Sequence, residues 1–145
     1  MLEINYPQPG FRVKKENGKD FLFDPLRKKW LLLTGEEWVR QNFVQYLVRV
    51  KNYPAALIAL EKMISLGELK KRFDILVYNN SHQPWMMIEC KEMNVKLNDN
   101  VLQQILRYNM AVPVKFMVIT NGKETFAWEK TETGLKTISD LPSPG

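Results

Sequence analysis

The chain has 145 residues, 45% of them hydrophobic and 26% charged, with a formal net charge of +5. This length and composition predict one soluble globular domain that buries about two-thirds of its unfolded surface, and they exclude a membrane-spanning segment, a signal peptide and a membrane partner. The lone Cys90 excludes an internal disulfide and favours a cytoplasmic setting, while the positive charge favours an anionic partner.

Residues 1–33 are expected to form an N-terminal hairpin extension that packs on the core. The stretch FRVKKENGKDFLF has two strand-like runs around Asn17 and Gly18, a strong hairpin-turn signal. The apolar segment 30–34 then leads into the first helix. No catalytic group is expected in this region.

The first helix is predicted to begin after Thr34, because Thr34 and Glu37 fit a capping box. Its buried stripe contains Val39, Phe43, Tyr46, Leu47 and Val50. Glu36 projects from within that stripe. It is either a first-turn acid favoured by the helix dipole or a carboxylate directed at a positive group. Glu37 is explained by capping.

Residues 56–64 are read as a strand, and the stretch from Arg72 to Lys91 as a hairpin with turn-forming residues at 79–84. A turn centred between Ser81 and His82 places Asp74 opposite Glu89, with Cβ atoms about 5 Å apart. Two carboxylates so close repel unless a divalent cation neutralises them. Lys91 shares the face of Glu89 and would lie near a water bound to that cation. The hairpin therefore suggests a metal site, with a surface ion-pair cluster as the alternative.

A second helix is expected from Asn98 or Asp99 onward, with Gln104 and Tyr108 together at one edge of its buried stripe. Strands at 115–120 and 125–130 flank the turn at Asn121 and Gly122. Residues 34–139 are thus expected to form the core of a single α/β domain. Residues 140–145 are expected to be a disordered tail.

Several types of chemistry find no support in the sequence. His82 is the one histidine and falls in a predicted turn, so a catalytic triad and a histidine-rich zinc site are not expected. Neither a phosphate loop nor a dinucleotide-binding fingerprint occurs. Carboxylates, lysine, amides and tyrosine remain.

The order of these motifs resembles the PD-(D/E)xK nuclease superfamily, which has the restriction-endonuclease-like fold. An acid lies on the second core strand, E-x-K on the third, and Q-x-x-x-Y on the following helix. The segments RFDILVYN, IECK, QILRY and ITNG are similar to the N-terminal nuclease domain of type I restriction enzyme R subunits, over roughly residues 34–128. The resemblance implies a mixed β-sheet flanked by helices, with the N-terminal β-hairpin added.

This sequence departs from that pattern in two places. Phe73 stands where the superfamily has a proline before the acid, which affects the turn more than the ligands. The type I R subunit also continues into a translocating motor that is not found in this sequence. A separate motor or specificity subunit is therefore an expected partner, and a homodimer stays open.

The resemblance also implies roles for individual residues. Mg²⁺, for which Mn²⁺ could substitute, would be held by Asp74, Glu89 and the backbone carbonyl of Cys90. Lys91 would orient or help to deprotonate the attacking water. The supporting residues would be Gln104, Tyr108 and Glu36, and the phosphate contacts Lys70, Lys71 and Arg72.

The function implied is a magnesium-dependent deoxyribonuclease of the restriction type without its own motor, an endonuclease rather than an exonuclease. The alternative is a catalytically silent module with a nuclease fold that docks on DNA or on another subunit. The sequence leaves open whether the substrate is DNA or RNA, which nucleotide sequence is recognised, and whether the chain is active without a partner.

Overall fold

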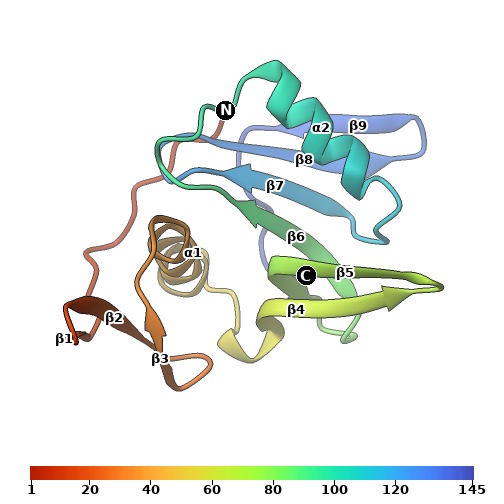
Figure 1. Cartoon of the computed structure of the whole chain (residues 1–145). Coiled ribbons are helices and arrows are strands. Elements are labelled where there is room, and N and C mark those ends of the chain that lie inside the picture. Colours follow the sequence, from red (N-terminus) through yellow and green to blue (C-terminus); the bar gives the residue numbers. More distant parts are fainter.

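A six-stranded mixed β-sheet has one helix on each face and a three-stranded sheet beside the first helix (Figure 1). The computed structural model describes residues 1–145 apart from the side chains of Leu66 and Leu69. This architecture confirms the predicted α/β fold class. No helix in the described chain is long and apolar enough to cross a membrane.

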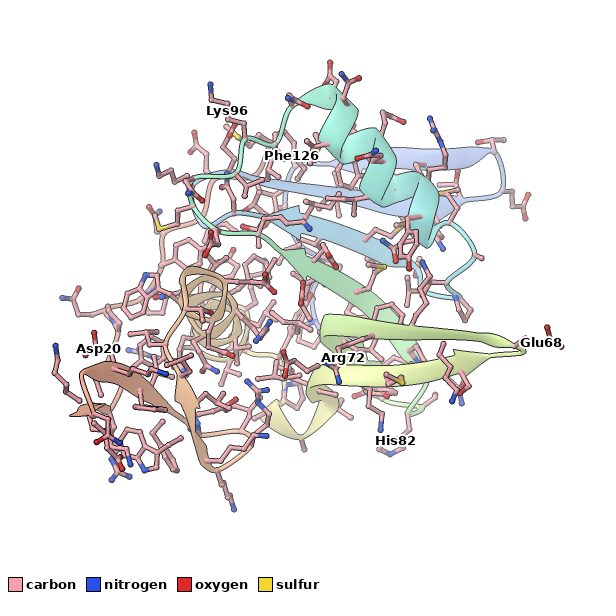
Figure 2. All side chains as sticks on the ribbon, in the orientation of Figure 1. Asp20, Glu68, Arg72, His82, Lys96 and Phe126 are labelled. Carbon is pink, nitrogen blue, oxygen red and sulfur yellow. The ribbon has the colours of Figure 1, made fainter. Side chains whose placement is uncertain are left out.

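The strands of the main sheet lie side by side in sequence order. They are β4 (Ile58–Leu66), β5 (Leu69–Tyr78), β6 (Pro84–Cys90), β7 (Phe116–Thr120), β8 (Thr125–Thr131) and β9 (Gly134–Ile138). Only the β6–β7 pair is parallel among the described strand pairs, and its crossover contains α2 (Asp99–Asn109). The β4–β5 hairpin extends away from α1, with Glu68 at its tip (Figure 2).

Alternating side chains of the central strands divide the core between the two faces of the sheet. Ile75 and Ile88 belong to the cluster that α1 covers, whereas Leu76 and Met87 belong to the cluster beneath α2. Because neighbouring residues of a strand point to opposite faces, the apolar runs in β5 and β6 supply both clusters at once. Glu89 lies between Ile88 and Cys90, which both point toward α1, so its carboxylate is on the α2 side.

Helix α1 (Gly35–Gln45) continues into a π-helical turn, Tyr46–Val50. Its start is confirmed, since the Thr34 hydroxyl accepts a hydrogen bond of 3.0 Å from the amide of Glu37. The predicted stripe is buried except at Val50, which is 46% exposed at the end of the turn. Helix α2 is capped by the side chain of Asn98.

The predicted N-terminal hairpin is present as β1 (Val13–Glu16) and β2 (Lys19–Asp24). Asn17 and Gly18 both have positive φ, as a tight hairpin turn requires. The apolar segment that follows is itself a strand, β3 (Lys29–Leu32), so the extension is a three-stranded sheet. Leu22 is fully buried and the rings of Phe11 and Trp38 are 5.6 Å apart, which fastens this sheet to α1.

The C-terminal tail differs from its predicted disorder. Leu141 is buried within the α1-side cluster. The Tyr53 hydroxyl donates a hydrogen bond of 2.6 Å to the carbonyl of Pro142, and the Asn80 amide donates one of 2.9 Å to the carbonyl of Gly145. A single apolar residue and two backbone acceptors thus hold a segment whose composition suggested no structure.

Candidate functional site

The two carboxylates of the central hairpin face each other across β5 and β6. The pairing of Ile75 with Ile88 confirms the predicted register, which places Asp74 next to Glu89 at the following step. The β-bulge in this pair lies near the turn, at Val77 and Tyr78, and so leaves the register at Asp74 unchanged. Asp74 Oδ2 also accepts a hydrogen bond of 2.8 Å from the amide of Cys90.

The surroundings of Glu89 disfavour its ionised form. Its side chain is only 26% exposed, and burial together with repulsion from Asp74 raises its pKa from 4.5 to about 7. The ammonium of Lys91 lies 3.7 Å from Glu89 Oε1 and acts in the opposite direction. Near neutral pH the positive charge of Lys91 is therefore not sufficient to keep Glu89 fully ionised beside Asp74.

Glu36 joins these carboxylates from α1. Burial and the charge of Asp74 raise the pKa of Glu36, which identifies Asp74 as a close neighbour. Glu36 Oε1 also lies 3.1 Å from Nη2 of Arg40, one helical turn along α1. Of the two interpretations of Glu36, the structure fits the one that directs it toward other charged groups.

Arg40 is a member of the site that sequence reasoning did not single out. Its side chain is 4% exposed; Nη2 is 3.4 Å from Asp74 Oδ1 and Nη1 is 2.6 Å from Glu37 Oε1. The i,i+4 spacing of Glu36 and Arg40 was a usable signal, since residues so spaced are neighbours on a helix. The carboxylate of Glu37 accordingly binds Arg40 and Gln41 in addition to the capping contact made by its amide.

Arg27, from the turn between β2 and β3, extends this cluster of charges. Its Nη2 lies 3.3 Å from Glu37 Oε2, and its Nε donates to the buried carboxylate of Asp24. Consecutive ion pairs thus run from Asp24 through Arg27, Glu37 and Arg40 to Asp74. The N-terminal sheet, where no catalytic group was expected, is therefore electrostatically connected to the candidate site.

A pocket of about 440 Å³ opens on the α2 side of the hairpin. Glu89 and Lys91 line one side, and Gln104 and Tyr108 of α2 line the other. The predicted i,i+4 pair on α2 therefore faces the predicted E-x-K pair across a space large enough for part of a substrate. Tyr108 is 71% exposed, and Arg72 also lines this pocket. Arg72 is labelled in Figure 2.

The three basic residues of β5 do not form one surface. Lys70 and Arg72 are exposed, whereas Lys71 is buried and donates hydrogen bonds to the carbonyl of Tyr108 and, at 3.3 Å, to Asn109 Oδ1. The cation of Lys71 lies at the C-terminal end of α2, where it complements the negative end of the helix. The prediction that Lys71 contacts phosphate is therefore wrong, because its ammonium group is buried.

The donor set fits a hard divalent cation. No group of three or more His, Cys, Asp or Glu side chains in the described part of the chain is arranged to hold an ion. Magnesium nevertheless needs only one or two carboxylates because it keeps several waters. The part-buried, mutually repelling Asp74 and Glu89 could supply them, and a bound cation would offset the burial and the repulsion that raise the pKa of Glu89. The Cys90 thiol is buried in the α1-side cluster, so only the backbone carbonyl of this residue could serve as a ligand.

A mixed sheet flanked by helices, with a carboxylate pair in the middle of β5 and near the end of β6, defines an α/β protein. The family model for the type I restriction enzyme R protein N terminus matches residues 35–142. The match spans most of the chain, so the chain belongs to this family and has a restriction-related role. It covers β4–β9 and both α-helices but not the N-terminal sheet. A comparison with curated proteins finds no match.

Proposed function

We propose that the chain is a divalent-metal-dependent nuclease that hydrolyses phosphodiester bonds of DNA, and that it acts as an endonuclease. The observation that carries this proposal is the opposition of Asp74 and Glu89 in a part-buried site, with Lys91 Nζ 3.7 Å from Glu89. Such a pair is unfavourable alone and becomes favourable when a cation and a phosphate group are bound beside it. Membership of the restriction family supports DNA as the substrate.

Each residue of the candidate site would have a separate role in hydrolysis. Asp74, Glu89 and the Cys90 carbonyl would hold Mg²⁺ or Mn²⁺. When bound, the ion would polarise the scissile phosphate, offset its added negative charge and lower the pKa of a water. Lys91, which is 35% exposed beside Glu89, would orient the attacking water and donate to a phosphate oxygen.

Residues around the pocket would position the nucleic acid. Gln104 and Tyr108 would contact the backbone next to the scissile bond, since both line the pocket that contains Glu89 and Lys91. Lys70 and Arg72 would bind neighbouring phosphates with salt-dependent affinity. Because the family is that of an R protein of a multisubunit enzyme class, other restriction subunits are the protein partners we propose.

Plasmid cleavage tests this proposal directly. Purified protein incubated with supercoiled plasmid and Mg²⁺ or Mn²⁺ should nick or linearise it, and EDTA should prevent the reaction. Asp74→Asn and Lys91→Ala should each reduce the rate on the order of 10²-fold or more. Lys136→Ala, which removes an exposed cation of β9, should leave the rate unchanged. Cleavage that survives Asp74→Asn would show that the nuclease activity comes from elsewhere.

One observation favours the alternative of a silent docking module. Both oxygens of Asp74 already accept internal hydrogen bonds, Oδ1 from Arg40 at 3.4 Å and Oδ2 from the Cys90 amide at 2.8 Å. A carboxylate whose two oxygens already accept hydrogen bonds gains less stabilisation from binding a metal ion. Calorimetric titration with Mn²⁺ separates the two functions, because Asp74-dependent binding supports the nuclease and its absence supports the docking module.

A further inference from the structure

We propose that a second ligand site, outside the candidate nuclease site, binds a nucleotide unit between the N-terminal sheet and the C-terminal end of the first helix. A cavity of about 440 Å³ lies there, and its lining includes Phe11, Arg12, Phe23, Gln45 and Arg49. These residues come from three separate segments, which meet where the sheet of β1–β3 lies beside α1 (Figure 1). The volume is within the range of small-ligand pockets.

Arg12 provides an ordered cation. Its guanidinium carbon lies 4.9 Å from the centre of the Phe23 ring and 5.4 Å from that of Trp30. Stacking on aromatic rings restricts the guanidinium but leaves its in-plane N–H donors free to bind a phosphate. Arg12 is exposed and forms no ion pair with any described residue.

Arg49 provides a second cation from the other side of the cavity. Its Nη1 donates a hydrogen bond of 3.0 Å to the carbonyl of Gln8, and its remaining donors are available. No Asp or Glu is among the described residues that line this cavity. Two guanidinium groups without an acid favour an anion, and forked donors fit the oxygens of a phosphate.

The remaining walls suit a nucleobase. The rings of Phe11 and Phe23 are half-buried; Phe11 is held by its edge contact with Trp38, and Arg12 already covers one face of Phe23. Aromatic faces bind bases by stacking with little dependence on sequence, and the Gln45 amide can both donate to and accept from a base edge. Phosphate-binding cations beside aromatic walls are therefore the reason to assign a nucleotide rather than a simple anion.

The nucleotide could belong to a nucleic acid strand or be free in solution. Arg49 follows Arg40 by nine residues, which is roughly 14 Å along a helix. At 3.4 Å per nucleotide, a strand held at Arg49 would reach the carboxylates near Arg40 in about four nucleotides. The pocket uses β2 and the segment before β1, which lie outside the family match, so its existence does not depend on the proposed nuclease activity.

Binding measurements on the whole chain in EDTA test the proposal, with deoxyadenosine monophosphate and a labelled single-stranded oligothymidylate as the two probes. Arg12→Gln and Arg49→Gln should each weaken binding by about tenfold. Lys19→Gln removes the same charge from an exposed position on the same sheet and should change affinity by less than about twofold. Phe23→Leu keeps every charge and should also weaken binding. Circular dichroism confirms that each variant folds.

The outcomes separate the two sources of ligand. Arginine-dependent binding of the mononucleotide identifies a site for free nucleotides, and arginine-dependent binding of the oligonucleotide alone identifies a contact for a strand. Both support the site. Equal weakening of binding by Arg12→Gln and Lys19→Gln would show that the probes are attracted only by the overall positive charge of the surface. That result would overturn the proposal. Absence of binding by both probes would overturn it as well.

Discussion

Replacing Glu89 by glutamine should stabilise the protein at alkaline pH while removing the proposed nuclease activity. The carboxyl group of Glu89 is buried beside Asp74, and these two causes raise its pKa from 4.5 to about 7. A glutamine side chain has nearly the same shape but no charge to bury. The variant therefore removes a cost that the wild-type protein pays whenever Glu89 is ionised.

The pKa shift sets the size and the pH range of this effect. Because the pKa is raised in the folded state, the folded protein binds more protons than the unfolded chain between about pH 4.5 and 7. The favourable contribution of neutral Glu89 is therefore complete below about pH 4.5 and is lost as the pH rises to about 7. At 1.36 kcal/mol per pKa unit, the loss amounts to at most about 3 kcal/mol.

Urea unfolding in EDTA at about pH 4 and about pH 8 measures this effect. The free energies of unfolding of wild type and Glu89→Gln should be similar at the lower pH, and the variant should be more stable at the higher one. Glu132→Gln, at an exposed position after β8, should match the wild type at both. A difference between Glu89→Gln and wild type that is independent of pH would refute the reasoning.

Two further predictions concern α1. Arg40→Ala should lower the free energy of unfolding by roughly 3–5 kcal/mol, because Glu37 and Asp74 lose their buried cation. Urea unfolding measures it, with exposed Arg107→Ala as the neutral control, and wild-type stability in Arg40→Ala would contradict it. Thr34→Ala should cost about 1 kcal/mol by removing the helix cap, while Thr34→Ser should not; thermal unfolding that gives equal losses would exclude the cap as the cause.

The connected ion pairs give the N-terminal sheet a structural role in the candidate site. Arg27 binds Glu37, and Glu37 in turn holds Arg40 against Asp74. Each guanidinium is shared among several acids, so movement of the sheet would change the charges around Asp74. The candidate site therefore extends beyond the segment that the family match covers.

Local sequence patterns were sufficient for much of the fold. Turn residues and alternation predicted the hairpin that opposes Asp74 and Glu89, and its register agrees with the structure. Thr34 marked the start of α1, and the i,i+4 spacing of Gln104 and Tyr108 placed both on one pocket wall. These signals act over a few residues, where backbone geometry dictates which side chains share a face.

The positions that sequence reasoning misjudged all depend on long-range contacts. Lys71 is part of a basic run, yet it is buried by its contacts with the C-terminal end of α2. The sequence explained Glu37 by helix capping alone, whereas in the structure its carboxylate also binds Arg27 and Arg40. Leu141 belongs to a Pro-rich tail, and its burial results from packing within the α1-side cluster.

The sequence by itself determined that a carboxylate pair and a lysine meet on one hairpin, because strand alternation and a single turn leave little choice of register. Only the tertiary structure decided which charges surround that pair. Glu36 and Arg40 arrive from α1, and Arg27 arrives from the N-terminal sheet. Coulomb interactions act between residues that are close in space at any separation along the chain, so the charge balance of Asp74 and Glu89 was a property of the fold.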